Sequence, residues 1–177
     1  MTEDISIERV GVNDIHLLQE ISQSTFVETF AKDNSPENMK DYVENKFSAA
    51  QLMNELSNAG TEFYFAKNAW EVIGYLKLNQ GEAQSELKDK NTLEIERIYV
   101  RASHQGKYIG QLLFKKAINQ FEVGRYDFVW LGVWEKNHKA IHFYSKNGFV
   151  PFDQHIFQLG DDKQVDIMMK YIRKDLQ

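Results

Sequence analysis

The chain has 177 residues, a formal net charge of −5 at pH 7 and no cysteine. This length is typical of a single domain, here residues 1–177, with a hydrophobic core of its own. The absence of cysteine excludes disulfide bonds, thiolate metal sites and reaction through an acyl-cysteine intermediate. An acidic chain is a poor match for nucleic acid, which requires a basic face. It tolerates or mildly favours a cationic ligand, although the same charge also serves solubility alone.

No segment is apolar for long enough to cross a membrane, and the N-terminal residues are acidic where a secretory signal is basic. We therefore expect a cytoplasmic protein that interacts with neither membranes nor nucleic acid. Its expected partners are a small molecule and, in the case of a homodimer, a second copy of the chain.

The N-terminal half begins with an expected strand and a set of helices. Residues 5–10 alternate as in a strand, and Asn13 or Asp14 is placed to cap the helix that follows. Pro36 marks a second helix start, and residues 48–51 fit a capping box ahead of another amphipathic segment. Strands are then expected over 62–67 and 71–79, followed by a polar loop over 80–91.

The C-terminal half alternates strands and helices. A strand over 93–100 precedes a helix to about residue 121, and a helix over 137–147 separates strands at 128–134, 149–159 and 164–173. Written as β-α-α-β-β-β-α-β-α-β-β, the order predicts an α/β (α+β) fold. We expect a mixed, mostly antiparallel sheet of six to seven strands flanked by about four helices.

The most informative segment joins a buried strand to a helix through a glycine-containing turn. Leu93–Val100 supplies the strand, and Gly106 and Gly110 lie in the turn. Glycines there let main-chain N–H groups converge on an anion, and the helix N-terminus adds partial positive charge. The segment therefore predicts a pyrophosphate site, although its glycine spacing fits neither a dinucleotide fingerprint nor a P-loop.

Two blocks of the sequence resemble the GNAT acetyltransferases. Gln105–Gly110 resembles the family's motif A, Gln/Arg-x-x-Gly-x-Gly/Ala, and residues 137–149 resemble a second block at the required separation. The resemblance implies the GNAT fold and acetyl-CoA, or CoA, as the bound co-substrate, with no metal. It implies contacts to that co-substrate from Ile98, Tyr99, Val100, Gln105, Gly106, Lys107, Tyr108, Ile109, Gly110, Gln111, Asn137, Lys139, Ala140, Phe143 and Lys146.

Tyr108 departs from the family pattern, because it stands where the family usually has glycine. Any residue other than glycine pays steric strain at positive φ. We therefore expect Tyr108 to keep an ordinary φ, with its ring turned outward and the main chain of the loop still able to bind pyrophosphate.

Glu94 and Glu96 lie two residues apart on the motif strand, so both side chains are expected on one face. Glutamate is rarely buried without a reason. Either the face is solvated, or Arg97 or a lysine pairs with one carboxylate, or one of them accepts the proton of an acceptor amine, as the GNAT resemblance implies. We favour Glu96 slightly, because it lies deeper along the strand toward the pantetheine arm.

Tyr144 lies in the second block, after the expected helix start at Asn137, and allows two interpretations. It is either a core aromatic beside Phe143 or, as the resemblance implies, the group that protonates the departing CoA thiolate. His138 and His142 have metal-ligand spacing on a helix, but Lys139 stands where a metalloprotease helix has glutamate. We expect no metal there.

Several blocks resemble bacterial spermidine/spermine acetyltransferases of the PaiA type, over nearly the whole chain: residues 34–40, 93–99 and 130–137 and the pair Gln84–Ser85. This resemblance implies direct transfer of acetyl to a primary amine, such as a polyamine, in a ternary complex. Carboxylates before and after residue 34 either line the acceptor side or form a solvated helix surface: Glu28, Asp33, Glu37, Asp41 and Glu44. A protein or peptide N-terminal acetyltransferase and a non-catalytic acyl-CoA-binding regulator remain alternatives.

Overall fold

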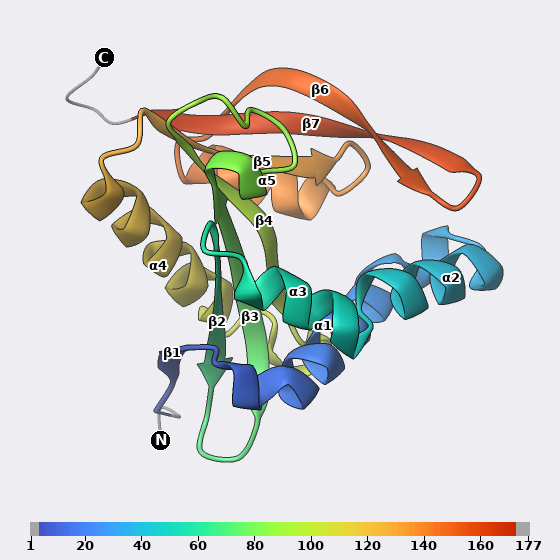
Figure 1. Cartoon of the computed structure of the whole chain (residues 1–177). Coiled ribbons are helices and arrows are strands. Elements are labelled where there is room, and N and C mark those ends of the chain that lie inside the picture. Colours follow the sequence, from blue (N-terminus) through green and yellow to red (C-terminus); the bar gives the residue numbers. More distant parts are fainter. Residues whose placement is uncertain (1–3, 173–177) are drawn as a thin grey trace.

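The computed structural model describes residues 4–172, which form one seven-stranded sheet with helices on both faces (Figure 1). The strands follow the order β1-β2-β3-β4-β5-β7-β6, and every neighbouring pair is antiparallel except the parallel pair β4–β5. Their bounds are Ser6–Arg9 (β1), Thr61–Lys67 (β2), Val72–Gln80 (β3), Thr92–Val100 (β4), Phe128–Trp134 (β5), Val150–Leu159 (β6) and Asp162–Ile172 (β7). The predicted mixed sheet is confirmed.

Five α-helices occur within residues 4–172, where the sequence predicted about four. The additional helix lies before β2, because the segments that begin at Pro36 and at residue 49 are separate helices. The helices are α1 (Ile15–Phe30), α2 (Pro36–Lys46), α3 (Ala49–Ser57), α4 (Ile109–Gly124) and α5 (His138–Lys146). The last residue of the final predicted strand, Arg173, lies outside the described residues.

The start of α1 differs from the prediction. Neither Asn13 nor Asp14 caps the helix with its side chain; a 3₁₀ turn over Val12–Asp14 leads into it instead. The Asp14 carboxylate accepts a hydrogen bond of 2.9 Å from the main-chain N–H of Gly11, so it stabilises the turn. The helix start at Pro36 is confirmed, and the hydroxyls of Ser35 and Ser48 each accept a main-chain N–H three residues later. The predicted capping box is only half formed, because the Gln51 side chain donates to Glu55.

Each face of the sheet packs its own hydrophobic core. Alternate residues of β2 and β3 point to opposite faces, so Tyr64 and Leu76 pack with α4 and α5, whereas Phe63 and Tyr75 pack with α1 to α3. The β6–β7 hairpin extends past the sheet to α2, where the Asn38 amide donates to Asp161 at 2.7 Å (Figure 1). The hairpin and the N-terminal helices thus lie on one side of the molecule.

The parallel pair β4–β5 is short and then separates. Pairing is limited to Thr92–Glu94 opposite Phe128–Trp130, although β4 continues to Val100 and β5 to Trp134. β4 also carries a bulge, because Lys77 faces Arg97 and Leu78 faces Ile95, which leaves Glu96 as the extra residue. The separation opens the sheet at its centre and leaves one edge of β4 without a neighbouring strand.

Candidate active site

A cleft of about 1430 Å³ lies where β4 and β5 separate. It is lined by β4, the loop before α4, the end of β5, α5, and residues of α1 and the β6–β7 hairpin. Every site residue predicted from the sequence lines this cleft except Lys107, which is exposed beside it. The structure therefore brings together two sequence blocks that are about thirty residues apart.

The loop before α4 presents main-chain N–H groups to the cleft. Gly106 has φ +80°, and α4 begins at Ile109 with no side-chain cap, so the first N–H groups of the helix have no partner within the helix. Gln105 donates to the Val100 carbonyl at 3.2 Å, and Lys139 of α5 donates to the Gln105 side chain at 2.8 Å. These bonds link the loop to both walls of the cleft.

Tyr108 contradicts one prediction and confirms another. Its φ is +64°, in the left-handed region, where the sequence predicted an ordinary φ. The loop must reverse direction immediately before α4, and this geometry overrides a steric preference of about 1–2 kcal/mol. The ring points outward as predicted, with 82% of the residue exposed. The loop thus keeps the conformation that glycine would adopt.

One half of the cleft, next to the loop before α4, has the groups expected of the co-substrate site that the sequence resemblance implies. An uncapped helix start suits a pyrophosphate, and the unpaired edge of β4 beyond Glu94 suits the amide groups of a pantetheine arm. Lys139 and Lys146 of α5 line the same half. Asn137, also in the cleft, caps α5, because its side-chain oxygen accepts from Ala140 N–H at 3.2 Å.

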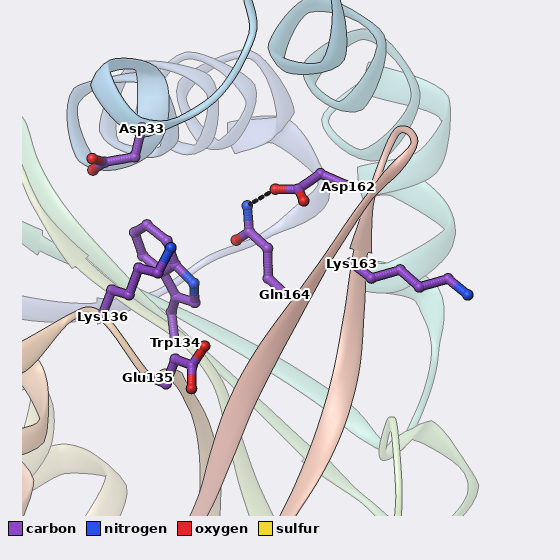
Figure 2. Close-up of a pocket in the computed structure, with 7 residues that line it drawn as sticks. All are labelled: Asp33, Trp134, Glu135, Lys136, Asp162, Lys163 and Gln164. Carbon is purple, nitrogen blue, oxygen red and sulfur yellow. Dashed lines mark hydrogen bonds between the residues drawn. The ribbon is translucent and has the colours of Figure 1, made fainter.

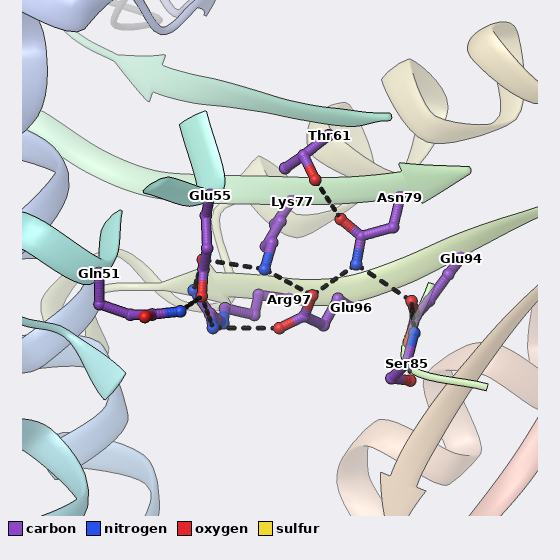
Figure 3. A network of polar contacts seen from close by, with 9 residues as sticks. All are labelled: Gln51, Glu55, Thr61, Lys77, Asn79, Ser85, Glu94, Glu96 and Arg97. Atoms are coloured by element: carbon purple, nitrogen blue, oxygen red, sulfur yellow. Dashed lines mark hydrogen bonds and ion pairs between the residues drawn. The ribbon is translucent and has the colours of Figure 1, made fainter. Parts of the chain in front are cut away.

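Glu96 belongs to a buried network of charges (Figure 3). Its carboxylate lies 2.6 Å from the Lys77 ammonium and 3.0 Å from the Arg97 guanidinium, and Glu55 of α3 pairs with the same two cations at 2.8 and 2.9 Å. Burial favours a higher pKa for Glu96, but the charges of Arg97 and Lys77 outweigh it and lower the pKa to about 2. The ion-pair interpretation is therefore confirmed for Glu96.

Glu94 has a different environment, although it points to the same face. Its carboxylate accepts hydrogen bonds from the Ser85 main chain (2.8 Å), the Ser85 hydroxyl and the Asn79 amide (3.1 Å). The residue is 3% exposed, and no ion pair with it occurs within residues 4–172. Burial raises the pKa of Glu94, and the nearby charge of Glu96 raises it further. Of the two carboxylates, Glu94 is thus the better proton acceptor.

The position of Tyr144 is compatible with both interpretations of its role. It packs against Phe143 and Phe149 in the core, at ring distances of 5.4 and 5.9 Å, and it also lines the cleft. Burial raises the pKa of Tyr144 above its usual value, so the phenol stays protonated at neutral pH.

The acidic residues around α2 do not together line the acceptor side, which was one of the two alternatives. Glu28 alone among them lines the large cleft, and its carboxylate accepts the main-chain N–H of Ala102 at 2.8 Å. Asp33 lines a separate pocket of about 150 Å³ beside Trp134 (Figure 2). The remaining three are exposed on α2, which agrees with the alternative of a solvated helix surface: Glu37, Asp41 and Glu44.

Sequence reasoning missed the residues that set the charge of the cleft. Lys77 and Asn79 alternate with leucines on β3, and polar residues in such an apolar strand were the available signal. Glu55 gave no signal, because a glutamate on a short helix is usually solvated. His155 and Asp166 also line the cleft and were not recognised.

Comparisons with known proteins agree with this geometry. Residues 16–149 match the Acetyltransferase (GNAT) family. The chain belongs to the GNAT family. It is 43% identical over 166 residues to an uncharacterized N-acetyltransferase of the pepI 3′ region of Lactobacillus delbrueckii subsp. lactis, covering 94% of this chain and 96% of that one. The chain is therefore an N-acetyltransferase.

Two further comparisons extend the likeness. A spermidine N(1)-acetyltransferase of Thermoplasma acidophilum is 26% identical, over 82% of this chain and 88% of the relative. The crystal structure of PaiA N-acetyltransferase from Thermoplasma acidophilum, in complex with coenzyme A, superposes with a TM-score of 0.80. That pair is 25% identical and covers 96% of this GNAT chain and 99% of PaiA.

Among residues 4–172, no three His, Asp or Glu side chains are grouped so that they could hold a metal ion. No helix in the described part of this GNAT protein is both long and apolar enough to cross a membrane.

The first prediction concerns the left-handed residue of the loop. Tyr108→Val should lower the free energy of unfolding by about 1–2 kcal/mol, because a β-branched side chain tolerates positive φ poorly. Tyr108→Gly should leave it within about 1 kcal/mol, since relief of strain offsets the greater chain entropy. Urea unfolding measures both, and a Val variant as stable as the parent would contradict the φ of +64°.

The second prediction concerns the buried charges. Glu55→Gln leaves Lys77 and Arg97 short of one anion and should lower the free energy of unfolding by about 3–5 kcal/mol. Glu20→Gln is the matched control, because Glu20 is an exposed partner of Arg101 and such surface pairs contribute about 0–1 kcal/mol.

Acid titration tests the same network in the parent protein. The pKa values of Glu55 and Glu96 are lowered on folding, so their contribution is complete above pH 4.5 and is lost as the pH falls toward about 2. Glu55→Gln should therefore lose less stability than the parent over that interval. Equal losses in the two proteins would show that Glu55 is not ionised in the native state.

Proposed function

We propose that this N-acetyltransferase transfers the acetyl group of acetyl-CoA to a primary amine of a polyamine such as spermidine or spermine, in a single ternary complex. The observation that carries the proposal is Glu94, a buried carboxylate that has no cationic partner among residues 4–172 and lies where β4 and β5 separate. It offers a proton acceptor beside an edge of β4 that is free to bind an acyl donor.

On the donor side, the main chain of Ile98–Val100 pairs with the pantetheine arm as an additional strand would. The N–H groups of Gly106–Gln111 bind the pyrophosphate at the start of α4. A main-chain N–H near Ile98 polarises the thioester carbonyl and stabilises the oxyanion that forms during attack. The ternary complex holds both reactants in place, and this orientation supplies much of the rate.

On the acceptor side, the amine arrives as an ammonium with a pKa of about 10. It loses one proton to Glu94, directly or through a water molecule, and the nitrogen lone pair attacks the thioester carbon. The sequence favoured Glu96 for this role, but its pKa of about 2 makes it a much weaker base. Glu96 instead balances the charges of Lys77 and Arg97 beneath the site.

The carbon–sulfur bond then breaks and CoA leaves as a thiolate. Tyr144 holds a proton on a buried phenol that lines the same cleft, and it donates this proton toward the sulfur. The nitrogen of the new amide loses a second proton. Of the two protons that the amine has lost, one replaces the proton of Tyr144 and the other leaves Glu94 for solvent, so the net products are the acetylated amine, CoA and one proton.

Three observations support a polyamine as the acceptor. One relative is named for spermidine, and the chain resembles PaiA over most of its length. The acceptor half has an aromatic wall in which the Phe30 ring lies 6.4 Å from Tyr99 and 6.1 Å from Trp134, which suits a methylene chain and its cations. Glu94 adds a negative charge that no lysine or arginine of the described chain pairs with.

The test is an acetyl-CoA-dependent thiol-release assay over polyamines, amino acids, aminoglycosides and short peptides. We expect spermidine or spermine to give the highest kcat/KM, and the KM for polyamine to rise with salt as screening weakens the attraction. A preference for peptide N-termini with inert polyamines would favour a peptide acetyltransferase. Binding of acetyl-CoA without turnover of any amine would favour a non-catalytic regulator.

The Tyr108 loop distinguishes an active donor site from a degenerate one. Tyr108→Gly should change the Kd for acetyl-CoA, measured by calorimetry, by about tenfold or less, or about 1.4 kcal/mol, because the parent loop already has the glycine conformation. If only the glycine variant binds, the parent is not an acetyl-CoA enzyme.

The third prediction separates the two carboxylates. Glu94→Gln should shift the pH–rate profile toward alkaline pH, because the amine must then lose its proton unaided. Glu96→Gln should lower the stability, because it unbalances the network, and leave the profile in place. Rates are compared from pH 6 to 10 below each variant's melting temperature. The proposed base is wrong if the Glu94 variant keeps the parent profile.

The fourth prediction concerns the proton donor. Tyr144→Phe removes one oxygen and little volume, so kcat should fall by about 10²–10⁴-fold. The Kd for acetyl-CoA should change little, since the ring remains packed against Phe143 and Phe149. Near-normal turnover at neutral pH would show that Tyr144 serves only as core packing.

A further inference from the structure

The face of the sheet that carries Glu94 continues across β5. Glu94 and Trp130 are directly opposite each other on β4 and β5, and they bond to consecutive residues of the preceding loop. Trp130 Nε1 donates to Gln84 at 2.8 Å, and Ser85 donates to Glu94. Both side chains therefore point to the face that carries the acceptor half of the cleft.

Gly132 lies two residues beyond Trp130 and belongs to the same face. A Cβ atom added there would lie 3.0 Å from His155 Cε1 and 3.5 Å from Asp166 Oδ2. These two residues are cross-strand partners on β6 and β7, and both line the cleft. The glycine thus leaves room for a His–Asp pair that extends the Glu94 site toward the hairpin.

Among residues 4–172, the ion pair of Asp166 is with His155. His155 Nε2 lies 3.6 Å from Asp166 Oδ2, and no lysine or arginine in residues 4–172 forms an ion pair with Asp166. The second ring nitrogen, His155 Nδ1, is buried without a hydrogen-bond partner. The contact with Asp166 raises the pKa of His155 against the opposing effect of burial, and the charges of Asp166, Glu86 and Glu94 add to the rise.

We propose that Asp166 binds an ammonium group of the acceptor other than the one that is acetylated, and that the His155 imidazolium holds this position when no acceptor is bound. This inference rests on the proposed function and assigns to Asp166 the selectivity for polyamines over monoamines. Glu94 and Asp166 are two carboxylates on one face of one cleft. A molecule with two or more ammonium groups neutralises both of them, whereas a monoamine engages Glu94 alone.

Replacement of the His155 imidazolium by a substrate ammonium leaves the net charge unchanged and makes substrate binding depend on pH. When the substrate ammonium pairs with Asp166, His155 releases its proton to solvent and remains as the neutral imidazole. The charged groups that face it are Asp166 on β7, Glu94 on β4 and Glu86 in the preceding loop. Acid pH keeps His155 protonated and in competition with the substrate, so the KM for a polyamine should rise as the pH falls through the His155 pKa.

The experiment compares spermidine with butylamine, which has a single amine, on the parent protein, Asp166→Asn and His155→Gln. Asp153→Asn is the control, because this exposed carboxylate on β6 lies outside the cleft and its loss changes the net charge equally. Asp166→Asn should raise the KM for spermidine by about tenfold or more and leave its kcat within about twofold. The KM for butylamine should not change.

The His155→Gln variant provides a second, independent test. It should flatten the rise of the spermidine KM between pH 8 and pH 6 and leave the butylamine profile as it is. Equal effects of Asp166→Asn on both amines would overturn this inference but not the proposed function. A parent-like pH profile in His155→Gln would do the same. If the parent acetylates neither amine, the proposed function fails, and the inference falls with it.

Discussion

The separation of β4 from β5 after Glu94 and Trp130 is the constraint on which the rest of the structure depends. Two parallel strands that stayed paired would satisfy each other's main-chain groups and leave nothing for a ligand. Here β3 pairs with one edge of β4 as far as Val100, while the other edge is unpaired beyond Glu94. The same opening admits the start of α4 and the side chains of α5 to one cleft.

Buried charges lie beneath that edge. The bulge at Glu96 lets Glu96 and Arg97, which are adjacent in sequence, form an ion pair across one side of the strand. Glu55 and Lys77 complete two anions and two cations, so this part of the cleft floor is neutral. Glu94 does not belong to this ion-pair network and accepts hydrogen bonds from uncharged donors of Ser85 and Asn79. One strand thus carries a carboxylate for structure and another suited to proton transfer.

Much of this could be predicted from the sequence, because strand alternation, proline at a helix start and the spacing of the Gln105–Gly110 turn are local signals. The conformation of Tyr108 could not, since side-chain preference opposes φ +64° and only the path of the loop into α4 imposes it. The difference in pKa between Glu94 and Glu96 could not be predicted from the sequence either. It depends on Glu55 and Lys77, which come from other elements and meet Glu96 only after folding.

The proposed mechanism requires that Glu94 and Glu96 differ in pKa, although both accept a hydrogen bond from the amide of Asn79. A ¹³C NMR titration of the glutamate carboxyl groups, with Glu94→Gln and Glu96→Gln used to assign the two signals, measures this directly. The account predicts that the pKa of Glu94 lies above 4.5 and that of Glu96 lies near 2. A Glu96 that titrates above Glu94 would contradict it and return the role of base to Glu96.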